Sequence, residues 1–117
     1  VLAQRLVRRN CAECGAAYTP DPADLPSDFS IGPGRTLTRG GGCRACRNTG
    51  FRGRVGIYEL LHMAPALREM VMERKAAPAI AQRALADDEL VTLRQDGFAK
   101  VLDGVTTVAE VSRALTV

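Results

Sequence analysis

The sequence contains no tryptophan, and its aromatic side chains are limited to two tyrosines and three phenylalanines among 117 residues. A core must therefore be mostly aliphatic, but 46% of the residues are hydrophobic, which suffices for one compact domain. No apolar run approaches the roughly 18 residues that a membrane-spanning helix requires, and the start lacks the sustained apolar stretch of a signal peptide. We therefore expect no direct membrane insertion.

Histidine is nearly absent too. The single one, His62, falls in an apolar segment that predicts a strand, where we expect an ordinary surface or packing role. The sequence also lacks the phosphate-binding pattern G-x-x-x-x-G-K-[ST]. The glycine run at residues 40–42 does not supply it, because no Lys-Ser or Lys-Thr pair follows. These absences exclude a P-loop nucleotide site in this sequence, and we predict no catalytic residue.

Four cysteines form two C-x2-C pairs, and these are Cys11 with Cys14 and Cys43 with Cys46. Two residues between cysteines allow a tight turn to aim both sulfurs at one point. Two such turns supply the four corners of a tetrahedral zinc site. The spacing therefore predicts one structural Zn²⁺ with these four cysteines as its ligands.

Other uses of paired cysteines fit less well. Two disulfides need an oxidising compartment, and no secretory signal is visible. A thioredoxin-like redox site lacks its βαβ context. Catalytic zinc sites keep one position open and usually employ histidine or carboxylate ligands. A chaperone-type cysteine repeat matches residues 43–50 alone, because its glycine pattern does not recur. Structural zinc is thus the leading prediction.

Positive charge concentrates in the first half of the chain. Residues 1–55 carry nine arginines and four acidic residues. Four thiolates on one divalent ion would reduce the net charge of this half from about +5 to about +3. Such a face is only mildly basic, and Tyr18, Phe29 and Phe51 are its only aromatic side chains for stacking on bases. A zinc-ribbon nucleic-acid-binding module therefore remains the alternative function, and nucleic acid is not the expected partner.

The first ten residues predict the end of a helix, because Leu2, Leu6 and Val7 recur at helical spacing. The chain begins inside this pattern, so we expect a piece of a longer protein. Residues 19–34 contain four prolines and predict a loop. Residues 54–63 are rich in apolar and β-branched side chains and predict a strand.

The remaining residues predict about four helices. Pro65 and Pro78 fit first helical positions. The sequences from Thr92 to Gln95 and from Thr107 to Glu110 match capping boxes, in which a hydroxyl caps a backbone N–H and the later side chain reaches back. Each box predicts the start of a helix in the tail.

The predicted fold is α+β, with a small zinc-stapled strand-and-loop subdomain followed by a helical C-terminal extension. We place the end of a helix from an upstream core at residues 1–10. The tetracysteine subdomain and the following strand occupy residues 11–63, and the helical extension occupies residues 64–117.

Three stretches are similar to one known family. Residues 4–14 and residues 43–59, with the run Gly-Phe-Arg-Gly-Arg-Val-Gly-Ile-Tyr-Glu, resemble the assembly ATPases of type II secretion and type IV pili. The tail from residue 93 to residue 111 resembles the end of the same proteins. The resemblance covers essentially the whole chain but does not separate secretion from pilus assembly. Retraction-type relatives lack the cysteines, which argues against that branch.

The resemblance implies a C-terminal zinc-binding module of a cytoplasmic, hexameric P-loop ATPase. Such an ATPase drives pilus or pseudopilus assembly at the inner membrane, to which it is bound through its partners. ATP and Mg²⁺ would then bind only to the full-length protein, and this fragment would have a structural and interaction role without hydrolysing ATP.

Expected partners are the ATPase core, neighbouring subunits and the platform proteins of the inner membrane. Arg52 and Arg54 follow the second cysteine pair, with Glu59 nearby, and are candidate interface residues. Exposed charges of this kind equally fit local salt bridges or simple solvation.

Overall fold

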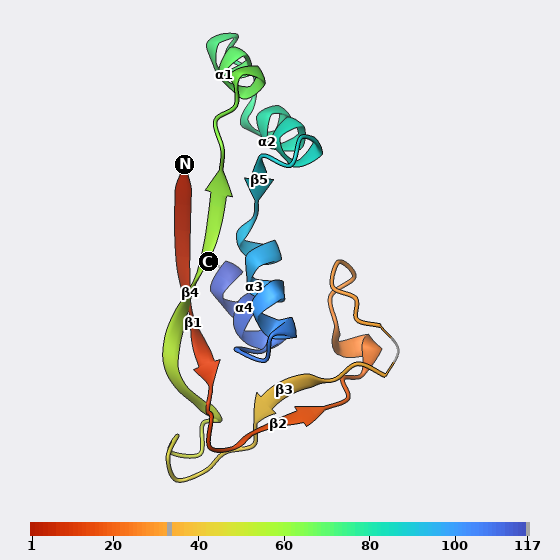
Figure 1. Cartoon of the computed structure of the whole chain (residues 1–117), viewed down its shortest axis with the longest axis vertical. Coiled ribbons are helices and arrows are strands. Elements are labelled where there is room, and N and C mark those ends of the chain that lie inside the picture. Colours follow the sequence, from red (N-terminus) through yellow and green to blue (C-terminus); the bar gives the residue numbers. More distant parts are fainter. Residues whose placement is uncertain (33, 117) are drawn as a thin grey trace.

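A computed structural model describes residues 1–32 and 34–116, and its mixture of strands and helices confirms the predicted α+β class (Figure 1). The elements in chain order are β1 (Leu2–Asn10), β2 (Gly15–Tyr18), the 3-10 helix η1 (Pro22–Asp24), β3 (Leu37–Gly40), β4 (Phe51–Leu61), α1 (Pro65–Met72), α2 (Ala77–Ala86), β5 (Leu90–Val91), α3 (Leu93–Leu102) and α4 (Val108–Leu115). The molecule is elongated, with principal extents of 56 × 30 × 21 Å.

The first ten residues are not the end of a helix, because residues 2–10 form strand β1. This strand pairs antiparallel with β4, from Leu2 opposite Leu60 to Arg8 opposite Arg54. Leu2 and Leu6 fit a helical spacing, but both are at least half exposed, so no apolar helical face is buried. The distant partner strand supplies the backbone hydrogen bonds that a helix would have made.

The predicted strand at residues 54–63 corresponds to β4, which begins three residues earlier and ends two earlier. It is the central strand of a three-stranded sheet with the order β1-β4-β5. Strands β2 and β3 form a separate two-stranded sheet, which extends away from the first one (Figure 1). The four cysteines lie where the chain passes between these two sheets.

The main core joins the loop between the cysteine pairs to the last two helices. Phe29 from this loop packs on Phe98 of α3, with ring centroids 4.7 Å apart. The buried members of the core are Phe29, Leu37, Phe98, Val101, Val108 and Val111. The division at residues 63 and 64 stays a prediction, and side chains from both sides of it share this core.

The predicted starts of the tail helices are confirmed in the structure. A proline lies at the start of both α1 and α2. Thr92 and Gln95 form a complete capping box on α3. The Thr107 side chain caps α4. The Glu110 carboxylate accepts from Arg8 and not from the backbone N–H of Thr107, so this capping box is incomplete.

Helices α1 and α2 lie at the end of the molecule opposite strands β2 and β3 (Figure 1). Among the described residues, no helix is long and apolar enough to cross a membrane. The fold therefore places the cysteine cluster and the α3–α4 pair near one another, and the first two helices apart from both.

Candidate metal centre

The structure brings all four cysteine sulfurs together, within 4.8 Å of one another. Three of the separations are short: Cys11 Sγ to Cys43 Sγ is 3.8 Å, Cys14 Sγ to Cys46 Sγ is 3.8 Å, and Cys43 Sγ to Cys46 Sγ is 3.7 Å. A tetrahedral zinc ion at about 2.3 Å from each sulfur places neighbouring sulfurs about 3.8 Å apart. The cluster therefore has the size that a tetrathiolate zinc site requires.

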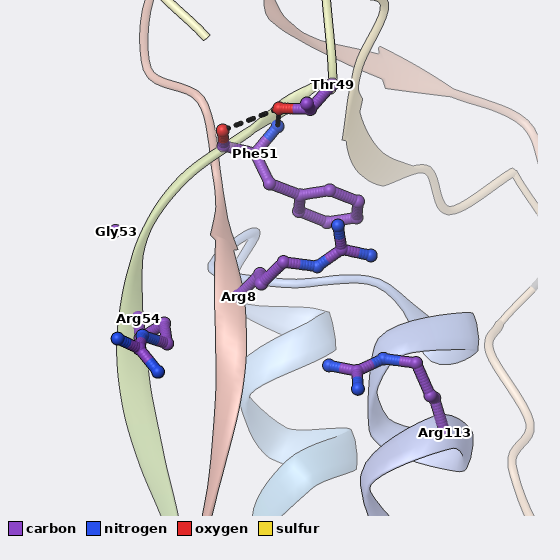
Figure 2. A pocket seen from close by; sticks show the side chains of 6 residues that line it. All are labelled: Arg8, Thr49, Phe51, Gly53, Arg54 and Arg113. Carbon is purple, nitrogen blue, oxygen red and sulfur yellow. Dashed lines mark hydrogen bonds between the residues drawn. The ribbon is translucent and has the colours of Figure 1, made fainter.

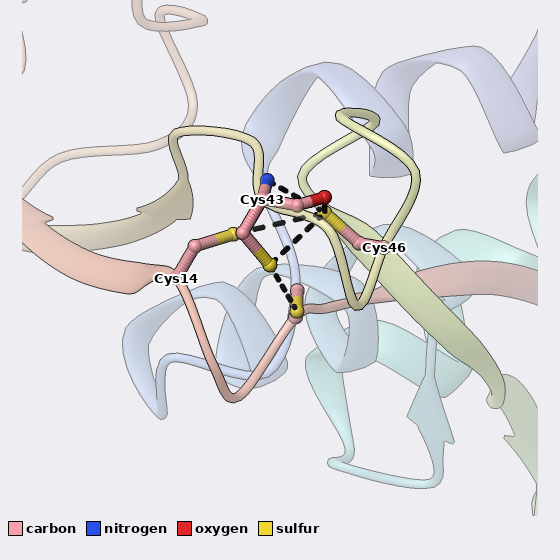
Figure 3. A group of neighbouring side chains, drawn as sticks. Cys14, Cys43 and Cys46 are labelled. Atoms are coloured by element: carbon pink, nitrogen blue, oxygen red, sulfur yellow. Dashed lines mark hydrogen bonds between the residues drawn. The ribbon is translucent and has the colours of Figure 1, made fainter.

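The strands on either side set this geometry (Figure 3). Cys11 directly follows β1, and Cys14 directly precedes β2. Cys43 follows β3 after the glycine run, and the second pair leads into β4. Each knuckle thus connects one sheet to the other, so an ion held by both knuckles would fix the two sheets relative to one another.

Backbone N–H groups point at the buried sulfur of Cys46. Cys43 N lies 3.3 Å from this sulfur and Gly50 N lies 3.2 Å from it. Burial alone raises the pKa of the Cys46 thiol, but these N–H donors, together with hydrogen bonds to the Cys43 and Cys14 thiols, lower the pKa to about 6. A metal requires the thiolate, so the donors favour the ligand form.

The half-buried thiol of Cys14 behaves in the opposite way. Burial, with the neighbouring thiols adding to it, raises the pKa of Cys14 to about 11. Four thiolates in so small a volume repel one another, and a divalent cation relieves that repulsion. The donor set of four sulfurs, without carboxylate or imidazole, suits zinc held for structure.

Asn10 links the cysteine cluster by hydrogen bonds to β3 and to the loop between α3 and α4. Its side-chain Nδ2 donates to the carbonyl oxygens of Thr38, Gly104 and Thr106, at 3.0, 3.1 and 3.3 Å. Its backbone N–H donates to the carbonyl of Val105 at 2.8 Å. The residue before Cys11 therefore holds β3 and the α3–α4 loop against the cysteine cluster.

A buried carboxylate makes a second tie. Glu110 of α4 is 2% exposed and accepts from both Arg8 and Arg113. The Arg113 guanidinium is the main cause that lowers the pKa of Glu110 to about 2; burial opposes this effect and Arg8 adds to it. The capping pattern predicts only a local role for Glu110, because its partner Arg8 is distant in sequence.

The three candidate interface residues do not form one group. Arg54 lies opposite Arg8, whereas Glu59 lies opposite Ala3, five residues further along β4 and about 17 Å away at the usual rise per residue. Among the described residues, no carboxylate lies within 4.0 Å of Arg52 or Arg54. Their interface role stays a prediction.

His62 lies just after β4, away from the cysteines. Its Nδ1 is 2.6 Å from the Glu89 carboxylate, and its side chain is 74% exposed. This position agrees with the surface role that its place in the sequence predicts.

Comparison with known proteins gives one consistent result. The family described as Type II/IV secretion system protein matches residues 1–113. The chain is 41% identical over 113 residues to "Type II secretion system protein E" of Dickeya dadantii, a match that covers 97% of this chain and 22% of that protein. The corresponding protein of Pectobacterium carotovorum is 42% identical over 113 residues, with the same coverage.

A pilus protein is equally similar. The "Type IV pilus assembly ATPase PilB" of Thermus thermophilus is 41% identical over 115 residues, covering 95% of this chain and 13% of that protein. The chain therefore spans less than a quarter of the length of these relatives. The similarities to the secretion and the pilus proteins do not separate the two groups.

Proposed function

Because the chain belongs to the type II/IV secretion system protein family, we propose that it is the zinc-binding module of an assembly ATPase. The zinc ion would be structural, held by Cys11, Cys14, Cys43 and Cys46. The observation that carries the proposal is the cluster of four thiols, whose sulfurs lie within 4.8 Å of one another and in three pairs only 3.7–3.8 Å apart.

The role of the zinc is to staple the β2–β3 ribbon, which has little core of its own, to the sheet of β1, β4 and β5. The six residues of β2 and β3 other than Tyr18 and Leu37 are all small, polar or glycine. Such a ribbon cannot bury enough apolar surface to fold alone, and a bound ion supplies folding free energy in its place. The hydrogen bonds of Asn10 to the α3–α4 loop, and of Glu110 to Arg8, would then hold α3 and α4 against the stapled sheets.

At the level of the machine, the full-length protein would be a cytoplasmic, hexameric ATPase that binds ATP and Mg²⁺ outside this segment. Its work would be assembly of a pseudopilus or a pilus. The module would contact the ATPase core, neighbouring subunits or inner-membrane platform proteins. Support comes from the similarity to named proteins of both systems and from an exposed arginine-rich surface beside the four cysteines.

Native mass spectrometry of the purified chain tests the proposal. We expect one zinc ion per chain, lost on chelation together with hydrogen-exchange protection across residues 10–50. Cys46→Ser should lose the ion, whereas Glu13→Gln, which changes an exposed side chain between two ligands, should retain it. A folded chain without metal, with protection unchanged by the chelator, would reject the proposal.

A further inference from the structure

An open hollow of about 450 Å³ lies beside the metal centre, where β1 and β4 approach α4 (Figure 2). Its lining residues are Arg8, Thr49, Phe51, Gly53, Arg54 and Arg113. Three of these six carry guanidinium groups, and they come from β1, β4 and α4. Elements far apart in sequence thus converge to place positive charge around one small volume.

Two of the arginines are cross-strand neighbours on the same face of the sheet. Arg8 and Arg54 are directly opposite in the β1–β4 register. Like charges in such a cross-strand pair repel and destabilise the sheet. A negative charge between or above the two guanidinium groups would therefore stabilise the pair, because it offsets their repulsion.

An irregularity in β4 creates this face. The register shifts between Arg8 and Asn10, so that Asn10 lies opposite Phe51, and Gly53 has φ of +81°. Between these two pairs β4 has one residue more than β1, as in a β-bulge, and this shifts the alternation of side chains along β4 by one position. Phe51 and Arg54 consequently share a face with Arg8, whereas Arg52 falls on the other face and does not line the hollow.

Two of the guanidinium groups are held in place before any ligand binds. The Arg8 guanidinium carbon lies 4.3 Å from the centroid of the Phe51 ring. Arg8 and Arg113 each donate two side-chain hydrogen bonds to Glu110. Their side chains nevertheless remain 46% and 59% exposed, so their outer edges are open to a ligand.

The charges around the hollow do not balance. Glu110 is the carboxylate shared by Arg8 and Arg113, and among the described residues no carboxylate lies within 4.0 Å of Arg54. Three guanidinium groups against one carboxylate leave two positive charges in excess. A guanidinium binds carboxylates and phosphates with paired hydrogen bonds, so the hollow suits an oxyanion.

We propose that this hollow is a docking site for an acidic segment of a partner protein, which places a carboxylate on Arg54 and an apolar neighbour against Phe51. The apolar ring favours a peptide over a bare anion. Arg113 lies in the last turn of α4, where the helix carries its negative end, and this penalises a phosphate dianion more than a carboxylate. The inference rests on the proposed role of the chain in a multiprotein assembly.

Fluorescence anisotropy on the zinc-loaded chain tests the site, with a labelled synthetic peptide of alternating Glu and Leu as the probe. We expect binding at low salt that weakens as salt increases. Arg54→Gln should weaken binding about tenfold, as expected for loss of one charged hydrogen-bonding partner. Arg52→Gln is the matched control, because it removes the same charge two residues away on the other face, and it should leave the affinity nearly unchanged.

Competition arms separate the sources of negative charge. Inorganic phosphate and vesicles of phosphatidylglycerol should compete poorly with the peptide. Equal losses for Arg54→Gln and Arg52→Gln, no peptide binding at low salt, or stronger Arg54-dependent binding to the vesicles would each overturn the proposal. Zinc content and hydrogen exchange are measured on every variant. Failure of a folded, zinc-loaded chain to bind peptide would therefore reject the docking site and leave the zinc staple standing.

Discussion

Glu110 of α4 accepts three hydrogen bonds from Arg8 of β1, although the two residues are 102 positions apart. The donors are the backbone N–H at 2.8 Å, Nε at 3.0 Å and Nη2 at 2.8 Å. Arg8 precedes Cys11 by only three positions. The last helix is thereby fixed to the strand that leads into the first cysteine of the cluster.

Glu110→Gln should destabilise the fold by about 2–3 kcal/mol at neutral pH, since the carboxylate is buried and paired with two arginines. The folded-state pKa of Glu110 is lowered from 4.5 to about 2. Its contribution is therefore fully present above pH 4.5 and is lost as pH falls toward 2, about 3 kcal/mol in all. Urea denaturation measured from pH 7 to pH 2 checks both effects.

The control for this prediction is Glu69→Gln, which changes an exposed glutamate on α1. It should leave both stability and the acid profile unchanged. The account of Glu110 fails if the two variants lose stability equally, or if the Gln variant shows the same loss between pH 4.5 and pH 2 as the original chain.

Phe29→Ala should destabilise the fold by about 3 kcal/mol, because the ring is buried against Phe98 in the shared core. Met72→Ala, at a side chain that is 80% exposed, is the control and should change stability by less than about 0.5 kcal/mol. Denaturation of both variants by urea checks the difference. A small effect at Phe29 would mean that the loop between the cysteine pairs does not share the core of the tail.

Helices α3 and α4 approach so closely that Gly97 has no room for a side chain. A Cβ at this position would lie 2.6 Å from Cγ1 of Val111. Gly97→Ala should therefore destabilise by about 1–2 kcal/mol through overpacking, although alanine is the better helix former by about 1 kcal/mol.

A double-mutant cycle with Val111→Ala checks this contact. Shortening Val111 removes the clash, so the alanine at position 97 should be tolerated far better in the double variant than alone. Simple additivity of the two changes, or a Gly97→Ala variant more stable than the original chain, would contradict the packing of α3 on α4.

The chain alone should not hydrolyse ATP. It lacks the phosphate-binding loop that would hold the nucleotide, and its glycine run leads into a cysteine knuckle instead. Phosphate release with ATP and Mg²⁺ should equal that of a Cys11→Ser preparation, which serves as the background. Turnover well above that background would place a nucleotide site within these residues.

The meeting of the four cysteines and the starts of the tail helices were predictable because their signals are local. Two residues between cysteines, a proline at a helix start and the Thr92–Gln95 box each act within a few positions of the chain. The four sulfurs meet as the spacing predicts.

The rest depends on pairing across the sequence. Strand β1 resembles a helix in its apolar spacing, and only its partner β4, beginning some forty residues later, makes it a strand. Strand β5 is two residues long, too short for any period to appear. The core contact of Phe29 with Phe98 joins a proline-rich loop to a helix, and no local pattern connects them.

The central claim is that four thiolates hold one zinc ion that staples the two sheets. X-ray absorption at the zinc edge of the chain as purified tests it most directly. The account predicts one zinc per chain with four sulfur neighbours at about 2.3 Å and no nitrogen or oxygen ligand. A zinc ion with fewer than four sulfurs, or a folded chain without zinc, would contradict it.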